Sequence, residues 1–154
     1  MRIRKMTASD VPFVAAIERE SFSRPWSERS FLEAVTDKNA CFLTALCSAP
    51  GISADGDGLV AGYIGMYLSP PEGEITNVAV AGEFRGKGFG TALVAAVQEA
   101  AVSLGIGQLF LEVRDSNATA VRLYEHSGFV EVGVRKGFYD FPREDARIMR
   151  WNRT

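Results

Sequence analysis

The chain has 154 residues, of which 47% are hydrophobic and 23% charged, and its formal net charge is −2. We expect one domain over residues 1–154, because that length builds a single core without disulfides or metals. The near-neutral charge argues against non-specific nucleic-acid binding, and no apolar run reaches the roughly 20 residues of a membrane span.

The cysteines and the amino-terminal residues bear on where the protein works. Cys41 and Cys47 are the only cysteines. On one strand they would lie about 20 Å apart, which is too far for a disulfide. Reduced thiols, and a start without the apolar region of a signal peptide, predict a cytoplasmic protein. With a single histidine, His126, and no Cys/His cluster, we expect no metal site.

The first 36 residues predict a strand and two helices. Alternation predicts a short strand over residues 2–6. Thr7, with Asp10 three residues later, has the pattern of a capping box and begins a helix that runs to about Ser21. Pro25 breaks the chain, and a second helix follows with Ser27 as its cap. The apolar sides carry Val11, Val14, Ala15 and Ile17 in the first helix, and Phe31, Leu32 and Val35 in the second.

Strand patterns follow from residue 40. Two apolar runs, residues 41–46 and 59–68, flank a stretch rich in Gly, Asp and Ser at residues 51–58, which predicts an exposed hairpin loop. A β-branched strand follows over residues 74–80. Links this short allow only antiparallel pairing.

A glycine-dense turn over residues 82–90 leads into a helix predicted over residues 91–104, with Gly105 just past its end. Its buried stripe is expected to hold Leu93, Val97, Ala100, Ala101 and Leu104. A strand at residues 109–114 completes a strand–helix–strand unit around Gly90. Such a unit predicts one parallel pair in an otherwise antiparallel sheet.

The remaining residues predict one more helix and a strand pair. Ser116 is the expected cap of a helix over residues 117–127, which Gly128 closes. Residues 129–135 and 146–151 then form the last two strands.

Glycines crowd the turn between the third strand and its helix, in the segment Arg85-Gly86-Lys87-Gly88-Phe89-Gly90-Thr91. Glycine lets consecutive backbone N–H groups turn inward, and the helix start adds partial positive charge. These features suit a pyrophosphate. Neither the Walker spacing nor the Gly-x-Gly-x-x-Gly fingerprint is present. The alternative is a tight turn with no ligand.

A second group of residues combines a carboxylate with a phenol. Asn117, Ala120 and Tyr124 share one helix face. Glu112, near the end of the preceding strand, lies on the side of Phe110 by strand alternation. The two side chains can therefore meet at the carboxyl edge of the sheet. The alternatives are a core tyrosine and a solvated glutamate.

The glycine segment, after a strand ending Asn77-Val78-Ala79-Val80, resembles the acetyl-CoA motif of the GNAT N-acetyltransferases, and the order of elements is similar from end to end. The resemblance implies an α/β (mixed α+β) fold, with a mostly antiparallel sheet of about six to seven strands and about four helices. It implies acetyl-CoA as co-substrate. The residues in contact with acetyl-CoA would be Val78, Ala79, Val80, Arg85, Gly86, Lys87, Gly88, Phe89, Gly90, Thr91 and Asn117.

Further segments resemble one branch of that superfamily, the RimI-type ribosomal-protein-alanine acetyltransferases. They are Pro25-Trp26-Ser27, Leu111-Glu112-Val113-Arg114, Ser116-Asn117, Leu123-Tyr124-Glu125 and Arg143-Glu144-Asp145-Ala146. The branch implies transfer of acetyl to the N-terminal amine of a protein, such as a ribosomal protein. Glu112 would accept the proton and Tyr124 would donate one.

The same resemblance implies that Trp26, Glu74 and Tyr139 contact the substrate, with Glu144 as a further candidate. Glu74 also aligns with the base of histone-acetylating relatives, so both carboxylates stay candidates for that role. Phe138-Tyr139 stands where the branch often carries two tyrosines.

Other acceptors are open: lysine side chains, polyamines or another small amine. A domain that senses acyl-CoA without catalysis is the alternative class. We expect a monomer or weak dimer with no nucleic-acid or membrane partner.

Overall fold

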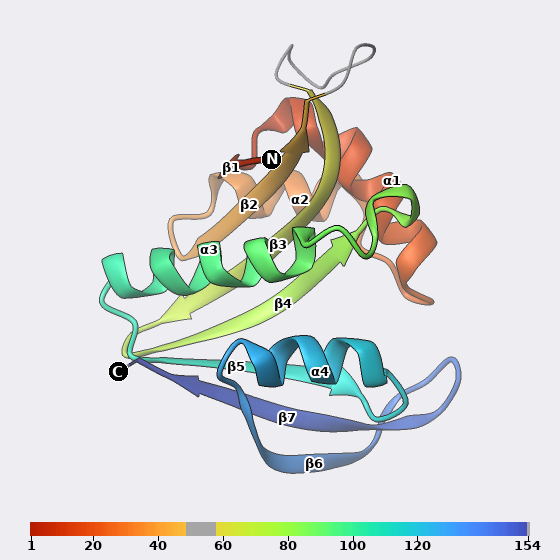
Figure 1. Ribbon diagram of the computed structural model, residues 1–154, viewed down its shortest axis with the longest axis vertical. Coiled ribbons are helices and arrows are strands. Elements are labelled where there is room, and N and C mark those ends of the chain that lie inside the picture. Colours follow the sequence, from red (N-terminus) through yellow and green to blue (C-terminus); the bar gives the residue numbers. More distant parts are fainter. Residues whose placement is uncertain (49–57, 154) are drawn as a thin grey trace.

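The computed structural model describes residues 1–48 and 58–153, which form one seven-stranded sheet between two layers of helices (Figure 1). The strands are β1 (Arg2–Lys5), β2 (Ala40–Cys47), β3 (Leu59–Ser69), β4 (Glu72–Val80), β5 (Gln108–Arg114), β6 (Val130–Tyr139) and β7 (Glu144–Asn152). Their order is β1-β2-β3-β4-β5-β7-β6. In this described part, β4 and β5 pair in parallel and all other neighbours are antiparallel. The predicted mixed sheet is confirmed.

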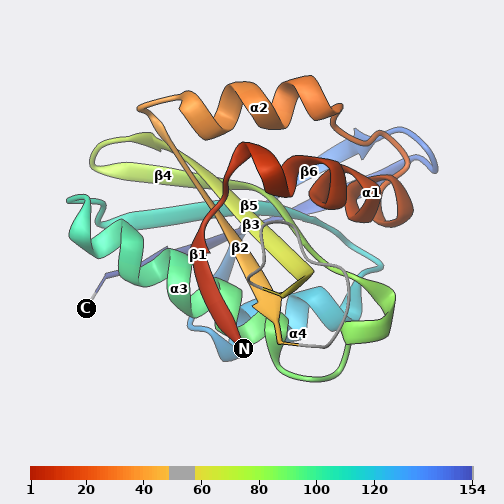
Figure 2. The same ribbon diagram turned by 90° about the horizontal axis from the view of Figure 1, so that it is seen from above.

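Helices cover both faces of the sheet (Figure 2). The helices α1 (Val11–Ser21) and α2 (Glu28–Thr36) lie on one face, and α3 (Phe89–Ser103) and α4 (Ala118–His126) on the other. The 3₁₀ turns η1 (Ala8–Asp10) and η2 (Gly82–Phe84) precede α1 and α3. None of the described helices is long and apolar enough to cross a membrane.

Each face of the sheet has its own hydrophobic core, because successive strand residues point to opposite faces. On the α3/α4 face, Ile64 packs with Leu93, Val97 and Leu109. On the α1/α2 face, the neighbouring Tyr63 packs with residues that include Val11, Val14 and Phe31. Both cysteines lie on β2 and are free thiols, as predicted.

Some sequence predictions about single positions were wrong. Leu104 is 50% exposed, although it was placed on a buried stripe, and Leu32, an apolar residue of the second helix, is 42% exposed. Leu104 is already the C-cap of α3, where helical periodicity no longer applies. In α2 the buried neighbour of Phe31 is Ala34. The predicted hairpin loop at residues 51–58 lies, up to residue 57, outside the described residues.

Two helix starts also differ from prediction. The N-cap of α4 is Asn117 rather than Ser116, and its side chain accepts the Ala120 N–H at 3.2 Å. Helix α3 begins at Phe89, two residues earlier than expected. Gly88 serves as its N-cap with φ +88°, a conformation that glycine adopts without strain.

The feature that makes room for a site is the separation of β4 from β5. The two strands pair only at Glu72–Gln108, Gly73–Leu109 and Glu74–Phe110, and then diverge (Figure 1). The register between β3 and β4 shifts at the residue between Ile75 and Asn77, which marks a β-bulge. The bulge resets the alternation, so that the side chain of Asn77 reaches Glu18 on the α1/α2 face.

Candidate active site

A cavity of about 610 Å³ lies between the diverging strands. Its walls come from β4, β5, α4, the end of α1 with the loop after it, and the tip of the β6–β7 hairpin. The cavity brings together six residues that the sequence singled out. They are Trp26, Val78, Glu112, Asn117, Tyr124 and Tyr139.

Tyr124 presents a phenol from α4. The residue is 5% exposed, and its ring packs against Phe129 with the centroids 5.8 Å apart. Burial raises the pKa of Tyr124 well above the ordinary value for tyrosine, and the nearby Tyr139 adds to the shift. The hydroxyl therefore stays protonated through the working pH range and can donate a hydrogen bond into the cavity.

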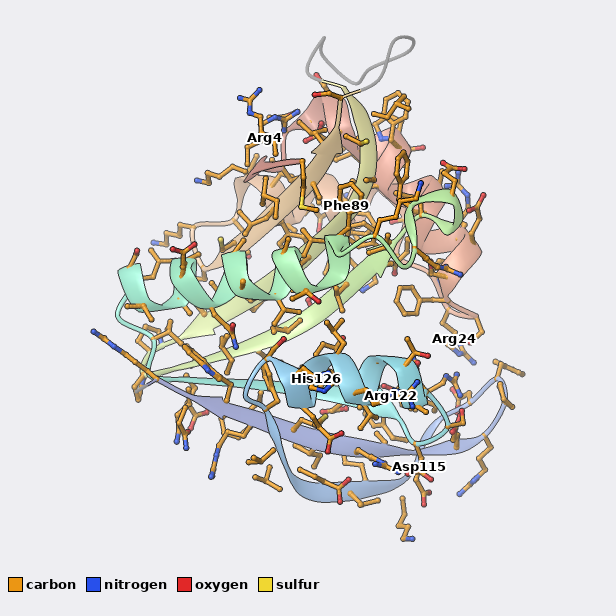
Figure 3. The ribbon with its side chains drawn as sticks, viewed as in Figure 1. Arg4, Arg24, Phe89, Asp115, Arg122 and His126 are labelled. Atoms are coloured by element: carbon orange, nitrogen blue, oxygen red, sulfur yellow. The ribbon has the colours of Figure 1, made fainter. Side chains whose placement is uncertain are left out.

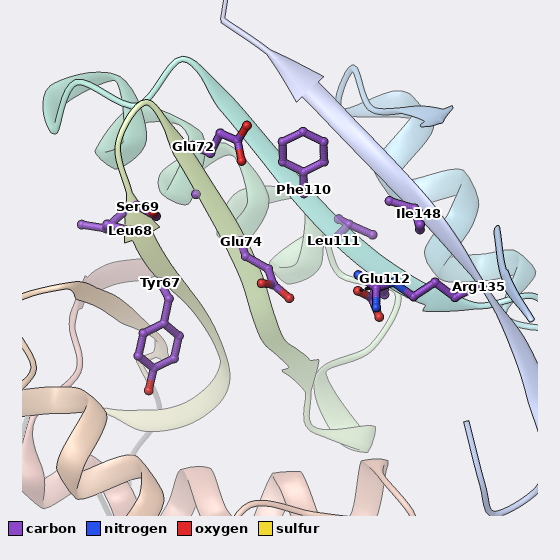
Figure 4. Close-up of a pocket in the computed structure, with 11 residues that line it drawn as sticks. Tyr67, Leu68, Ser69, Glu72, Glu74, Phe110, Leu111, Glu112, Arg135 and Ile148 are labelled. Carbon is purple, nitrogen blue, oxygen red and sulfur yellow. Dashed lines mark ion pairs between the residues drawn. The ribbon is translucent and has the colours of Figure 1, made fainter. Parts of the chain in front are cut away.

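Glu112 presents a carboxylate from β5, and its side chain is 18% exposed. Burial raises its pKa, the Arg135 guanidinium opposes that shift, and the charge of Glu74 adds to it. Nε of Arg135 lies 3.3 Å from a Glu112 oxygen. Figure 4 shows this ion pair, with Glu74 on the neighbouring strand. A carboxylate with a raised pKa is a stronger proton acceptor.

Glu74 lies beside the main cavity rather than in it. It lines an adjoining cavity of about 330 Å³ together with Glu72, Phe110 and Arg135 (Figure 4). Leu111 and Glu112 line both cavities. The two candidate bases therefore share one side of the sheet, and of the two only Glu112 also faces the cavity that Tyr124 lines.

A buried polar cluster that the sequence did not reveal joins α1 to the sheet. Glu18, 2% exposed, accepts a hydrogen bond from the Tyr63 hydroxyl and another from the backbone N–H of Trp26 at 3.0 Å. The Asn77 amide nitrogen lies 3.5 Å from both oxygens of Glu18. One signal was available: Glu18 follows Val14 by four residues and Val11 by seven, so it shares their apolar helix face.

Arg114 is a second residue with a role that the sequence did not indicate. Its guanidinium donates to the carbonyls of Pro142 at 2.8 Å and Phe141 at 3.2 Å, and lies 4.3 Å from the centre of the Tyr139 ring. It also lies 3.4 Å from the Ser23 hydroxyl, in the loop after α1. Arg114 thus links β5, the β6–β7 hairpin and the α1–α2 loop around the cavity.

Glu144 belongs to the same arrangement. Its carboxylate accepts the Ser116 N–H at 2.5 Å and pairs with Arg114 at 3.3 Å. These contacts hold the tip of the β6–β7 hairpin against the start of α4. Glu144 is not among the residues that line the cavity.

The glycine segment, residues 85–91, lies beyond the cavity at the turn from η2 into α3. Gly86 and Gly88 have φ +75° and +88°, and no heavy atom lies within 4 Å of a Cβ built on either. The first residue of the helix, Phe89 (Figure 3), is buried, and its ring packs on that of Phe84 with the centroids 5.6 Å apart. The turn therefore leaves open space beside Gly86 and Gly88, next to the start of α3, whose first N–H groups have no partner within the helix.

The backbone of β4 beyond Glu74 offers a second element for a cofactor. Val78 and Ala79 pair with β3 on one edge of the strand, while pairing with β5 on the other edge has already ended. An extended ligand could add to that free edge. Among residues 1–48 and 58–153, no cluster of His, Cys, Asp or Glu could hold a metal ion.

A mixed sheet that opens between two parallel strands, with a glycine-rich helix start beside the opening, agrees with the family match. The model of the acetyltransferase (GNAT) family matches residues 11–129, so the chain belongs to that family. The protein is an N-acetyltransferase that uses acetyl-CoA.

Individual relatives are similar over almost the whole chain. A candidate [ribosomal protein bS18]-alanine N-acetyltransferase of Bacillus subtilis is 33% identical over 147 residues, covering 96% of this chain and 92% of the relative. The [ribosomal protein bS18]-alanine N-acetyltransferase of Escherichia coli K12 is 30% identical over 149 residues, with 96% and 94% covered. The crystal structure of the ribosomal-protein-S18-alanine N-acetyltransferase from Escherichia coli superposes with a TM-score of 0.82 at 29% identity, covering 98% of this chain and 92% of that one.

Proposed function

We propose that the enzyme acetylates the N-terminal α-amino group of a protein that begins with alanine, such as a ribosomal protein, with residues 1–154 acting as one catalytic domain. The observation that carries the proposal is the single cavity lined by both Glu112 and Tyr124. The relatives named as ribosomal-protein-alanine acetyltransferases support the choice of acceptor. A ribosomal acceptor also favours the cytoplasm as the site of action.

The cofactor contacts follow from the two elements beside the cavity. Residues 85–91 and the start of α3 would hold the pyrophosphate of acetyl-CoA through backbone N–H groups. The free edge of β4, from Val78 to Val80, would pair with the pantetheine arm, and Asn117 would lie beside its inner end. Backbone N–H groups of that edge would also stabilise the oxyanion.

The reaction needs one bond formed and one broken. The amine nitrogen attacks the thioester carbon, the C–N bond forms, and the C–S bond breaks. Glu112 takes the proton that the amine loses, and Tyr124 donates a hydrogen bond or proton to the departing sulfur of coenzyme A. No covalent enzyme intermediate is required, which suits the position of Cys41 and Cys47 on β2, outside the cavity lining.

An α-amino acceptor matches the strength of this base. Its pKa is about 7.7–8.0 against about 10.4 for lysine, so it is easier to deprotonate by about 3.4 kcal/mol. Trp26 and Tyr139, which both line the cavity, are the proposed contacts for the peptide chain that follows the amine. Glu74 would face the same chain from the adjoining cavity.

The test is coenzyme A release from acetyl-CoA with a panel of acceptors. The panel holds a peptide that copies the alanine terminus of a ribosomal protein, an N-blocked lysine peptide and spermidine. We expect turnover on the alanine terminus, and a loss of about 10²–10⁴-fold in kcat for Glu112→Gln and Tyr124→Phe. Turnover only on lysine or spermidine would refute the proposed acceptor, and a Glu74→Gln variant that loses more than Glu112→Gln would reassign the base.

A further inference from the structure

Glu18 and Asn77 are two buried polar residues that line the cavity. They are 2% and 4% exposed. No ion pair among the described residues involves Glu18, and its three neighbours are hydrogen-bond donors of the protein: Tyr63, Trp26 and the Asn77 amide. Burying a carboxyl group without a paired cation costs free energy, so a role for Glu18 beyond packing is indicated.

The carboxylate fixes which way the Asn77 amide faces. Both Glu18 oxygens lie 3.5 Å from the Asn77 amide nitrogen, so the nitrogen, which donates, is the atom turned toward the carboxyl group. The amide oxygen, Oδ1, then points away from Glu18. It is buried and has no hydrogen-bond partner, while the residue lines the cavity. A buried acceptor without a donor is unfavourable, so a ligand that supplies an N–H there is favoured.

Asn77 and Glu112 flank the space where β4 and β5 part. Asn77 is three residues past Glu74, the last β4 residue paired with β5, and Glu112 is two residues past its partner, Phe110. The bulge turns Asn77 to the α1/α2 face. Glu112 lies on that same face, close enough to Glu74 for their charges to interact (Figure 4). The cavity is therefore lined by Asn77 on one strand and by Glu112 on the other.

We propose that Asn77 Oδ1 accepts one N–H of the attacking amine while Glu112 accepts another, so that the site selects primary over secondary amines. A neutral primary amine has two N–H bonds and one lone pair. With both N–H bonds held, the lone pair is directed at the thioester carbon. The nitrogen then loses its proton to Glu112 as the C–N bond forms and the C–S bond breaks. Glu18 acts as a positioning residue that orients the amide of Asn77. The inference rests on the proposed function.

A matched set of peptides tests the selection. The acceptors are identical except at the first residue, which is alanine, N-methylalanine or α-aminoisobutyrate. The last adds a methyl group but keeps both N–H bonds, so it controls for bulk. We expect kcat/KM to fall about 10- to 100-fold for N-methylalanine, in keeping with one unsatisfied buried acceptor, and less for α-aminoisobutyrate.

The variant Asn77→Val removes both amide atoms and suits a strand. We expect kcat/KM of this variant to fall about 10- to 100-fold on the alanine peptide and less than about threefold on the N-methylalanine peptide. The ratio of the two kcat/KM values, alanine over N-methylalanine, should therefore approach one. The exposed loop residue Asn39, changed to valine, is the control and should leave the ratio as it is. Acetyl-CoA affinity and Tm show whether Asn77→Val still folds.

Glu18→Gln tests the positioning role. Glutamine can donate as well as accept, so the Asn77 amide is no longer held one way. The ratio should then narrow even if acetyl-CoA binding is unchanged, whereas a purely structural role would lower Tm and leave the ratio unchanged. An unchanged ratio in both Asn77→Val and Glu18→Gln overturns the inference.

Failure of the proposed function is recognised separately. If the wild type leaves the alanine peptide unmodified but acetylates another primary amine, the proposed acceptor is wrong. The ratio is then measured with that amine and its N-methyl derivative. A ratio near one for the wild type overturns the selection, and the absence of turnover on every amine overturns both proposals.

Discussion

The carboxyl of Glu112 is held between opposing influences. Burial and the charge of Glu74 raise its pKa, and Arg135 opposes them from β6. Arg135 is itself 57% exposed, so solvent screens part of its effect. The base strength of Glu112 thus depends on Arg135, which lies outside the main cavity. Arg135 can therefore be replaced without altering the cavity that Tyr124 lines.

Replacing Arg135 with glutamine should raise the pKa of Glu112 further, because a nearby positive charge favours the ionised form. Since the base works only when ionised, the lower inflection of the kcat/KM profile should move to higher pH by about half a unit. The profile is measured from pH 5 to 9 with the alanine peptide. The control is Lys136→Gln, an exposed neighbour that pairs with Asp145. An inflection that both variants move equally would contradict the assignment.

The turn into α3 shows how backbone conformation prepares a binding site. Gly86 and Gly88 both have positive φ, while Gly82, in η2, does not, and all three have open space where a Cβ would stand. Gly82 therefore differs from Gly86 and Gly88 only in its backbone conformation. A side chain at Gly88 is strained by its φ, whereas one at Gly82 is neither strained nor crowded.

Gly88→Ala should cost about 1 kcal/mol of backbone strain and weaken acetyl-CoA binding several-fold, because relief of the strain turns the first N–H groups of α3 away from the pyrophosphate. Gly82→Ala should bind acetyl-CoA like the wild type. Both dissociation constants can be measured by titration calorimetry without an acceptor. If both variants bind normally, the turn is a connection only, and the phosphates lie elsewhere.

Elements that depend on local signals were predicted well from the sequence. Gly105 and Gly128, which follow α3 and α4, have the expected positive φ, and the parallel strand pair followed from the strand–helix–strand unit around Gly90. The cap of α4 was missed by one residue, since Ser116 and Asn117 are both good caps. The bulge in β4 could not be predicted, because it depends on pairing with β3 rather than on its own residues.

The site residues divide in the same way. Glu112 and Tyr124 carry recognisable chemistry within one short stretch of sequence, and the structure places both in one cavity. The contacts of Arg114 with Ser23 and Phe141 join segments far apart in the chain, and no local pattern reports them. Asn77 was visible as part of a motif, but its role depends on Glu18, 59 residues away.

At the scale of the whole molecule, one cavity is reached by elements from both faces of the sheet. The glycine turn and α3 lie on one face of the sheet, and α1 with its following loop lies on the other (Figure 2). The opening between β4 and β5 connects the faces, because residues from α1 and from α4 line the same cavity. Acetyl-CoA would enter from the α3 face and the acceptor from the α1 face, so neither blocks the other.

A conjugate that joins coenzyme A, through an acetyl linker, to the α-nitrogen of the alanine peptide should therefore span the cavity. Linking the two ligands makes the second contact intramolecular, at an effective concentration near millimolar, so the conjugate should bind about 10²-fold or more tightly than coenzyme A alone. Thermal shift and calorimetry measure this directly. Glu112→Gln should bind the conjugate almost as well as the wild type, because no proton is removed. A conjugate joined through a lysine side chain is the comparison, since its longer stem places the peptide farther from Trp26 and Tyr139. If neither conjugate exceeds coenzyme A, the two substrates do not share one continuous channel, and the acceptor must reach the thioester by a path other than the α1 face.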